Sequence, residues 1–400
     1  MNKRIKSTLI KIEKKPILAV KYLLSTVLIP AVIVMRIIKP IYKIRLGFFS
    51  VDSVGHFALD LGYAIAINQN KNKNEINLYY LQGNISNAQL KVIAKRELNI
   101  SQYYKYFVYA YTMLGLGNNV IVPHRRKSGS RDTVGIMRNF TYDILLSTHE
   151  NKMSELYLER YRWTKGERFI CINVRDSAFA NESKSEMGRH TYRNSDIDDY
   201  EAATNYLLDL GYWVVRMGKK VENPFKIRHA KLIDYAVDSD RSDLLDIWLC
   251  KNCEFFISTG TGIDSVAAMF KKQIVFVNYL PILIIISWIN SITLPKRLFW
   301  ENGKELSLTE HLDNSFLNTY QYKDKKIKIV NLTSDEIKCA VQEMINRLDD
   351  LCLTNKQSQD QSKFWNILEN HKLYDKYHGV RDLNASFGTS FLKNNQDFLS

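Results

Sequence analysis

The chain has 400 residues, 46% of them apolar, and a formal net charge of +14. A chain of this length and composition can bury a full core and suits two domains with appendages. The five cysteines are odd in number and lack framework spacing, which argues against a disulfide-stapled secreted domain and fits a reducing cytoplasm. Cys250 and Cys253 form a lone CxxC, which we interpret as structural because a zinc site needs four ligands.

The positive charge is concentrated at the start of the chain. The first fifty residues hold eleven Lys or Arg against Glu13 alone, so 11 − 1 = +10 lies there and the other 350 residues carry +4. A nucleic-acid binder more often spreads basic residues over a folded face with aromatic residues among them. The distribution therefore indicates a basic arm.

Residues 1–46 are apolar as well as basic. Tyr22 to Met35 is uncharged but is interrupted by Pro30, and it is shorter than the roughly twenty residues that cross a bilayer. The run has no signal-peptide cleavage site after it. We expect a segment lying in the cytoplasmic face of the membrane, with its lysines on anionic head groups. A tilted span stays open as the alternative.

Residues 47–165 form the first predicted domain. A strand from Leu46 to Val51 leads into a helix that Ser53 caps, with His56 and Asp60 one turn apart on it. This arrangement puts His56 at the carboxyl edge of a sheet, where it can take a proton from an acceptor hydroxyl. The alternative is a structural histidine paired with Asp60.

Further elements follow up to a boundary near Trp163 to Arg168. They are a strand at Ile76 to Leu81, helices at Ser86 (as cap) to Leu98 and Tyr103 to Leu114, a strand at Val120 to Pro123, and a basic loop at His124 to Arg131. The loop is either solvated or in contact with an anionic partner.

Residues 166–355 form the second predicted domain, in which strands alternate with helices. The predicted strands are Phe169 to Val174, Trp213 to Met217, Leu232 to Ala236, Phe255 to Ser258 and Ile274 to Val277. Helices begin at Ser195 or Asp196, Asp243 and Ile263. This alternation predicts an α/β fold with a doubly wound parallel sheet.

A turn of small residues joins the strand at Phe255 to the next helix. It contains Ser258, Thr259, Gly260, Thr261 and Gly262, and Asp264 and Ser265 follow. Backbone N–H groups at such a strand–helix turn, together with the helix dipole, suit a phosphate. The alternative is an ordinary tight turn, because no full phosphate-loop or dinucleotide motif is present.

Other polar residues also follow strand ends. Arg175 and Asp176, Gly218 and Asn278 are expected at the same edge of the sheet as the turn, and Arg216 lies inside the strand that ends before Gly218. Arginine suits a diphosphate because its planar fork bridges two oxygens. For Arg175, a salt bridge with Asp176 or another acid is the alternative.

The end of the chain is less regular. Ile282 to Ile289 is an apolar run that suits either core or lipid, and Thr333 to Glu336 begins a helix reaching Leu348. Residues 356–400 are interpreted as a linker, polar at Lys356 to Ser362, and a tail that packs back on the body.

An ordered set of motifs between residues 50 and 395 resembles a family of bacterial surface-polysaccharide glycosyltransferases. The set is Ile172 to Phe179, Tyr192 to Ile197, Gly211 to Gly218, Ser258 to Asp264, Asn278 to Pro281, Leu294 to Lys296 and Ser390 to Leu392. The second half is also similar to inverting fucosyltransferases, in which an arginine at the place of Arg175 faces the sugar nucleotide. Those enzymes usually have a histidine where this chain has Asn173.

The resemblance implies a GT-B-like fold, with two Rossmann-like domains facing a cleft, an acceptor in the first and a nucleotide-sugar in the second. It implies no metal and no further cofactor, because Arg175, Arg193, Arg216 and the turn would stabilise the leaving diphosphate. Candidate bases are His56, then Asp60, then Asp176. Asp264 and Asn278 complete the expected donor site.

The leading hypothesis is a glycosyltransferase at the cytoplasmic membrane face, extending a lipid-linked glycan of an O-antigen or capsule. The same fold also suits a polyol-phosphate transferase or a sugar epimerase. A rival of another class is a non-catalytic scaffold that binds anionic lipid or glycan. Formation of product from a lipid-linked acceptor separates an enzyme from a scaffold.

Overall fold

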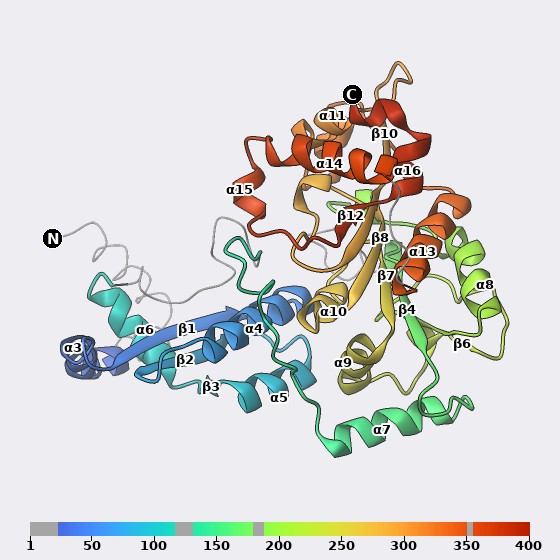
Figure 1. The fold of residues 1–400 in the computed structure, drawn as a ribbon. Helices are drawn as coiled ribbons and strands as arrows, with labels where there is room; N and C mark the ends of the chain where they lie inside the picture. The colour runs from blue at the N-terminus through green and yellow to red at the C-terminus, as the bar shows by residue number, and fades with distance from the viewer. Residues whose placement is uncertain (1–22, 117–130, 179–187, 350–354) are drawn as a thin grey trace. The chain divides into compact units, whose positions relative to one another are not determined.

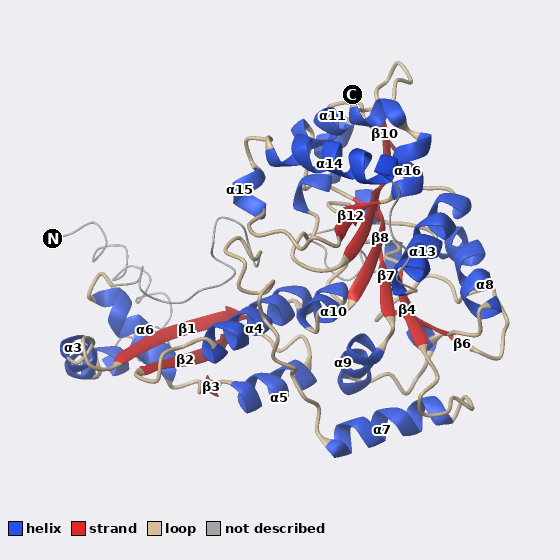
Figure 2. Ribbon diagram, viewed as in Figure 1, coloured by secondary structure: helices blue, strands red, loops and turns tan. Residues whose placement is uncertain are grey.

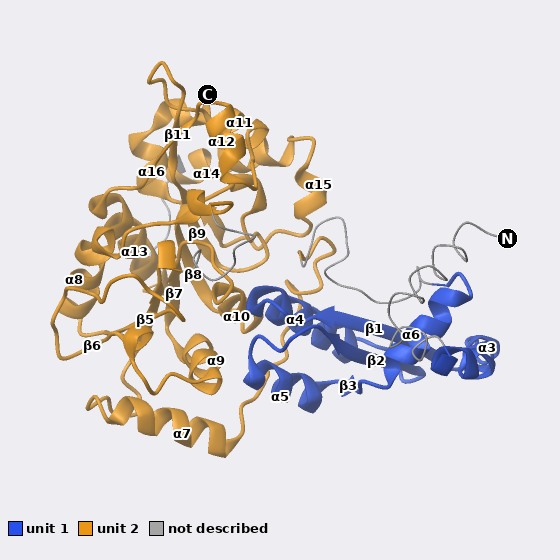
Figure 3. Ribbon diagram, turned by 180° about the vertical axis from the view of Figure 1, so that it is seen from behind, with its two compact units in different colours: residues 1–130 blue, residues 131–400 orange. Residues whose placement is uncertain are grey.

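The computed structural model describes residues 23–116, 131–178, 188–349 and 355–400 (Figure 1). The chain divides into two compact units, residues 1–130 and 131–400 (Figure 3). This division falls before the predicted boundary because helix α7 (Thr148–Glu159) is tied to the second unit. Tyr157 of α7 donates to Asp238 at 2.6 Å, and Trp248 donates its indole N–H to Asn151 of α7 at 3.0 Å.

The first unit contains a parallel sheet in the order β1-β2-β3. Its described elements are α3 (Ile29–Ile37), β1 (Lys43–Ser50), α4 (Val54–Gln69), β2 (Glu75–Gln82), α5 (Ala88–Glu97), β3 (Asn99–Ile100) and α6 (Tyr104–Met113). The predicted strands at residues 46–51 and 76–81 are thus confirmed. Asn87, not Ser86, caps α5, since its side chain accepts the Leu90 N–H at 2.9 Å. The predicted strand at Val120 to Pro123 and the loop at residues 124–130 lie outside the described residues.

Helix α3 belongs to the core of the first unit. Val32 and Met35, one turn apart, are buried against Phe48 of β1 and Val108 and Tyr111 of α6. None of the helices described in the structure is long and apolar enough to cross a bilayer.

The second unit contains a parallel sheet in the order β12-β9-β8-β7-β4-β5-β6 (Figure 2). Its strands are β4 (Phe169–Asn173), β5 (Trp213–Met217), β6 (Leu232–Ile233), β7 (Phe255–Ser258), β8 (Gln273–Tyr279), β9 (Ser291–Pro295) and β12 (Ala385–Phe387), and β10 (Arg297–Phe299) pairs antiparallel with β11 (Lys328–Val330). The predicted α/β class with parallel sheets is confirmed. The expected facing of two domains about a cleft stays a prediction.

Helices cover both faces of this sheet. α8 (Glu201–Asp209) packs against α13 (Ser334–Leu348) on one face, and α9 (Asp243–Asn252) packs against α10 (Asp264–Met269) on the other (Figure 2). The remaining helices are α11 (Leu308–Asp313), α12 (Thr319–Asp324), α14 (Asn355–Glu369), α15 (Tyr374–Tyr377) and α16 (Thr389–Asn394). The apolar run at Ile282 to Ile289 is mostly buried, with Trp288 1% exposed.

The end of the chain differs from the predicted polar linker. Residues 356–362 lie in the helix α14, whose apolar residues Phe364, Trp365 and Leu368 follow that window and are buried. The strand β12 then joins the edge of the sheet beside β9. The Gln361 side chain accepts the Phe387 N–H at 3.0 Å, so α14 and β12 stabilise each other.

Candidate functional site

The direction of strand order reverses between β4 and β7. From β4 the chain proceeds through β5 to β6 on one side, then returns to β7 and proceeds through β8 to β9 on the other. In open parallel sheets the helices after such strands lie on opposite faces, which leaves a crevice at the carboxyl ends of the two central strands. Arg175 follows β4 and the turn at Ser258 to Gly262 follows β7, so both lie at this switch point.

The backbone of Arg175 is fixed from two sides. Its N–H donates to Thr259 Oγ1 at 3.0 Å, and its carbonyl accepts the Ser195 N–H at 2.8 Å. The first bond joins the ends of β4 and β7, and the second brings the segment that carries Arg193 to the same place. Arg175 and Arg193 are both half-buried.

Several arginines lie near enough to Tyr192 to affect its pKa. Burial raises the pKa of Tyr192, and the charges of Arg193, Arg175 and Arg189 oppose this rise. The Arg193 guanidinium has no hydrogen bond or ion pair with any part of the chain that the structure describes. The switch point therefore carries concentrated positive charge, which suits an anion with more than one charge.

Lys296 is a member of this region that the sequence did not single out as a site residue. It is 3% exposed, and its ammonium donates to the Asn194 carbonyl and to Asn331 Oδ1, the latter at 2.8 Å. Burial lowers the pKa of Lys296 to about 8. Because Asn194 follows Arg193 directly, Lys296 holds the segment that carries Arg193. The position of Lys296 directly after the strand β9 is the feature that could have identified it as a site residue.

The turn after β7 is bonded mainly within itself. Gly260 donates its N–H to Ser258 Oγ at 3.1 Å, Thr261 donates its N–H to Asp264, and Ser258 donates to Asp264 at 2.7 Å. The buried Asp264 carboxylate thus takes the Thr261 N–H and Ser258 Oγ takes the Gly260 N–H, two groups that we expected to hold a phosphate. Burial raises the pKa of Asp264 to about 6. The helix that follows, α10, has only six residues.

The hydroxyl groups of the turn join it to β4. Asn173 donates its side-chain N–H to Thr261 Oγ1 at 2.6 Å, and Thr259 accepts from Arg175. Thr261 and Gly262 are half-buried, unlike Ser258 and Thr259. A Cβ added to Gly218 would lie 3.9 Å from Asn173 Oδ1, so the end of β5 lies beside the same side chain.

Three predicted site residues have structural partners. Arg216 is 1% exposed and donates to the Asn223 carbonyl at 2.7 Å and to Asp234 at 3.3 Å, so it forms a buried ion pair beneath a loop. Asn278 lies within β8 and accepts the Leu332 N–H at 2.7 Å. Asp176 accepts the N–H groups of Ala178 and Glu222 at 3.0 and 2.8 Å, which orders its loop.

His56 and Asp60 lie on α4 in the first unit. His56 is exposed on the first turn of the helix, and Asp60, one turn later, is fully buried. An exposed imidazole near the carboxyl end of β1 can accept a proton from a bound hydroxyl. A buried carboxylate such as Asp60 is less suited than His56 to take a proton from an acceptor that enters from solvent.

Cysteine and surface features elsewhere do not extend the site. Burial raises the pKa of Cys171 and Cys250 well above the ordinary value, as expected of unreactive thiols. Among the described residues, no group of three or more His, Cys, Asp or Glu side chains is arranged to hold a metal.

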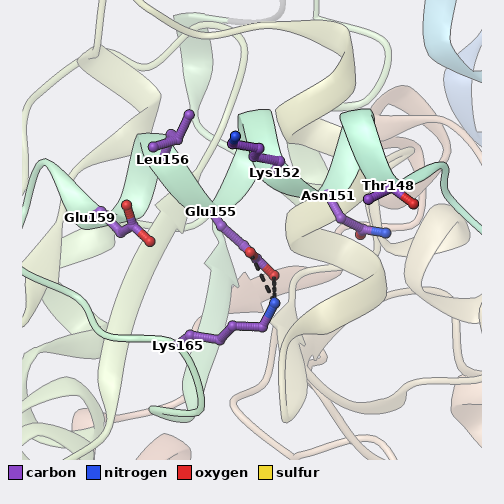
Figure 4. Close-up of a pocket in the computed structure, with 7 residues that line it drawn as sticks. All are labelled: Thr148, Asn151, Lys152, Glu155, Leu156, Glu159 and Lys165. Carbon is purple, nitrogen blue, oxygen red and sulfur yellow. Dashed lines mark hydrogen bonds and ion pairs between the residues drawn. The ribbon is translucent and has the colours of Figure 1, made fainter.

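A shallow groove of about 590 Å³ runs along α7, between Thr148 and Glu159, with an ion pair from Lys165 to Glu155 at 2.8 Å (Figure 4). Asn151 in this groove bonds Trp248, which stacks on Phe169 at the start of β4. The groove thus lies toward the amino end of β4, away from Arg175.

No protein-family model matches the chain, and no curated protein matches it. Matching solved structures include glycosyltransferase family 9 from Veillonella parvula (9% identity, 76% of this chain and 98% of that one, TM-score 0.46). They also include E. coli ADP-heptose LPS heptosyltransferase II (12%, 59% and 85%, TM-score 0.34) and S. aureus MnaA with UDP (10%, 89% and 96%, TM-score 0.29). Glycosyltransferases are therefore among the structural neighbours, and the likeness to fucosyltransferases stays a prediction.

Proposed function

We propose that this chain is a glycosyltransferase that moves a sugar from a nucleotide-sugar to a glycan acceptor. The observation that carries the proposal is that Arg175 and Arg193 lie on two segments that meet at the switch point of the second sheet. A backbone bond from Ser195 to Arg175 holds the two segments together, and Lys296 fixes the residue after Arg193. Two half-buried arginines on segments held in this way suit two linked phosphoryl groups.

The arginines contribute most where charge develops. When the acceptor oxygen attacks the anomeric carbon, the bond from that carbon to the diphosphate oxygen breaks and negative charge grows on the diphosphate. One well-aimed donor to such a group lowers the barrier by about 3 kcal/mol. In this proposal Arg175 and Arg193 stabilise the leaving group without a metal, and the Asn173 bond to Thr261 ties the β7 turn to the end of β4.

His56 is the proposed base. Its exposed imidazole takes the proton that the acceptor hydroxyl loses as the new glycosidic bond forms, and the buried Asp60 lies one turn later on the same helix. We propose a lipid-linked glycan of a surface polysaccharide as the acceptor, because the first fifty residues carry +10 by count and are rich in apolar residues. His56→Ala should then abolish transfer without weakening nucleotide binding.

Nucleotide binding tests the donor site directly. Thermal unfolding of the full chain is followed with UDP, GDP, ADP, CDP and TDP, with and without EDTA. At least one nucleotide should stabilise the chain in EDTA, and Arg175→Ala or Arg193→Ala should weaken its binding roughly 10- to 100-fold, since a charge-assisted bond contributes about 1.5 to 3 kcal/mol.

Arg168 provides the matched control. It is exposed directly before the amino end of the same strand, β4, and lies over the Tyr212 ring. Arg168→Ala should leave nucleotide binding unchanged. No stabilisation by any of the five nucleotides, or an equal effect of all three alanine variants, contradicts the proposed donor site. Binding without product from a labelled lipid-linked acceptor and a panel of nucleotide-sugars would favour the scaffold.

A further inference from the structure

The outer side of helix α3 exposes a stripe of apolar side chains. Within α3, Ile33 is 46% exposed, Val34 is 55% and Ile37 is 71%, while Val27 before the helix is 72% exposed and Ile41 after it is 78%. Residue 37 lies four positions after residue 33 and three after residue 34, which is the spacing of one helical face. We call Ile33, Val34 and Ile37 the outer stripe.

The opposite side of α3 is attached to the first unit. Val32 is fully buried and Met35 is 9% exposed, and both belong to the cluster that contains Phe48 and Tyr111. Because this face holds the helix along the unit, the outer stripe presents its side chains outward. Isolated exposed apolar residues are ordinary on protein surfaces, whereas a contiguous stripe marks an interaction surface.

The charges beside the stripe favour an anionic partner. Arg36 and Lys39 are exposed next to it, whereas Lys43 and Arg45 are paired with Glu75 at 2.9 and 2.8 Å. These four are among the eleven Lys or Arg of the first fifty residues, which contain a single Glu. An apolar face flanked by basic residues is the composition of a helix that lies in the interface of an anionic bilayer.

We propose that the outer stripe of α3 docks the first unit onto an anionic lipid bilayer, with its apolar side chains among the acyl chains and Arg36 and Lys39 on the head groups. The helix lies along the membrane surface, since its inner face stays packed against β1 and α6. This inference does not depend on the donor site, which belongs to the second unit.

Fluorescence tests the docking at the residue itself. All six tryptophans lie between Trp163 and Trp365, so Ile37→Trp in the full chain introduces a tryptophan where the first unit has none. Vesicles of phosphatidylcholine and phosphatidylglycerol with brominated acyl chains should quench this added emission. Leu383→Trp is the matched control, because Leu383 is an exposed apolar residue of the second unit, and its emission should not be quenched.

Sedimentation with vesicles measures the affinity. Ile33→Gln, Val34→Gln and Ile37→Gln together should weaken partition into the anionic vesicles about 100-fold, which corresponds to roughly 3 kcal/mol. The control triple Leu145→Gln, Val237→Gln and Leu383→Gln also replaces exposed apolar residues and should change partition little. Replacing phosphatidylglycerol by phosphatidylcholine, or adding salt, should weaken binding of the unaltered chain.

Other occupants of the stripe give different results. If a second copy of the chain covers it, the Gln triple abolishes self-association in analytical ultracentrifugation and leaves vesicle binding unchanged. If residues 1–22 cover it, their lysines bind vesicles by charge alone, and the added tryptophan stays unquenched. Either result overturns the proposal, as does equal vesicle binding by the two triple variants. Circular dichroism of each variant confirms that it is folded.

Discussion

Replacement of Asp264 by Asn is expected to stabilise the protein at neutral pH. Asp264 is 3% exposed, and one of its oxygens, Oδ2, accepts hydrogen bonds from Ser258 Oγ and from the Thr261 N–H. The Asn carbonyl at that place can accept both bonds. The substitution therefore removes a buried charge while it keeps the bonds of the turn.

The raised pKa of Asp264 sets the magnitude and the pH range. Its folded pKa of about 6 lies above the ordinary 3.8, so its contribution to stability is full below pH 3.8 and is lost as pH rises through 6. This difference corresponds to roughly 3 kcal/mol. Asp264→Asn should therefore raise the free energy of unfolding by up to about 3 kcal/mol at pH 8, and by much less near pH 4.

Urea unfolding followed by tryptophan fluorescence reports on this unit, because every tryptophan lies within residues 131–400. Asp324→Asn, at an exposed carboxylate at the end of α12, is the control and should change stability by less than about 0.5 kcal/mol at either pH. A difference between Asp264→Asn and the unaltered chain that does not grow as pH rises from 4 to 8 would refute the reasoning.

Three further predictions concern the same unit. Gly260→Ala should destabilise it by about 2 kcal/mol more than Gly303→Ala in urea unfolding. Both glycines have positive φ (+77° and +84°), but only at Gly260 would the new Cβ meet a neighbour, the Tyr279 ring at 2.6 Å. Equal losses of stability in the two variants would contradict this. Lys296→Met should weaken nucleoside diphosphate binding about 10-fold in calorimetry by releasing the segment that carries Arg193. Adding Arg193→Ala to this variant should weaken binding little further. Additive effects of the two substitutions would show that Lys296 does not act through Arg193. Burial lowers the pKa of His378 to about 4, so its contribution to stability is full above pH 6.5 and is lost as pH falls through 4. His378→Gln should reduce the acid destabilisation by up to about 3 kcal/mol in urea unfolding across this range. An unchanged pH dependence would contradict the lowered pKa of His378.

Local sequence determined the order of elements in the second unit. Runs such as Phe169 to Asn173 and Phe255 to Ser258 are apolar up to their last residue, as strands buried on both faces must be. Ser242 and Thr333 cap the helices α9 and α13. The parallel sheet and the meeting of Arg175 with the β7 turn follow from this order, because parallel strands place their carboxyl ends at one edge.

Tertiary structure decided which polar groups are available there. Arg216 and Arg193 look alike in the sequence, yet Arg216 is paired with Asp234 beneath a loop and Arg193 has no such partner among the described residues. The turn after β7 has the composition of a phosphate site, but Asp264 accepts the Thr261 N–H and Ser258 accepts the Gly260 N–H. Both outcomes depend on partners several residues away whose side-chain directions local spacing does not specify.

The sequence by itself determined the α/β class, the strand–turn–helix units and the edge where the arginines meet, because periodicity, caps and glycine turns act over a few residues. Only the tertiary structure decided that β12 enters the sheet beside β9 and that the outer stripe of α3 stays exposed while Val32 is buried. Strand pairing across long separations, and burial of one helical face in place of another, are set by the packing of the whole unit and leave no local pattern in the chain.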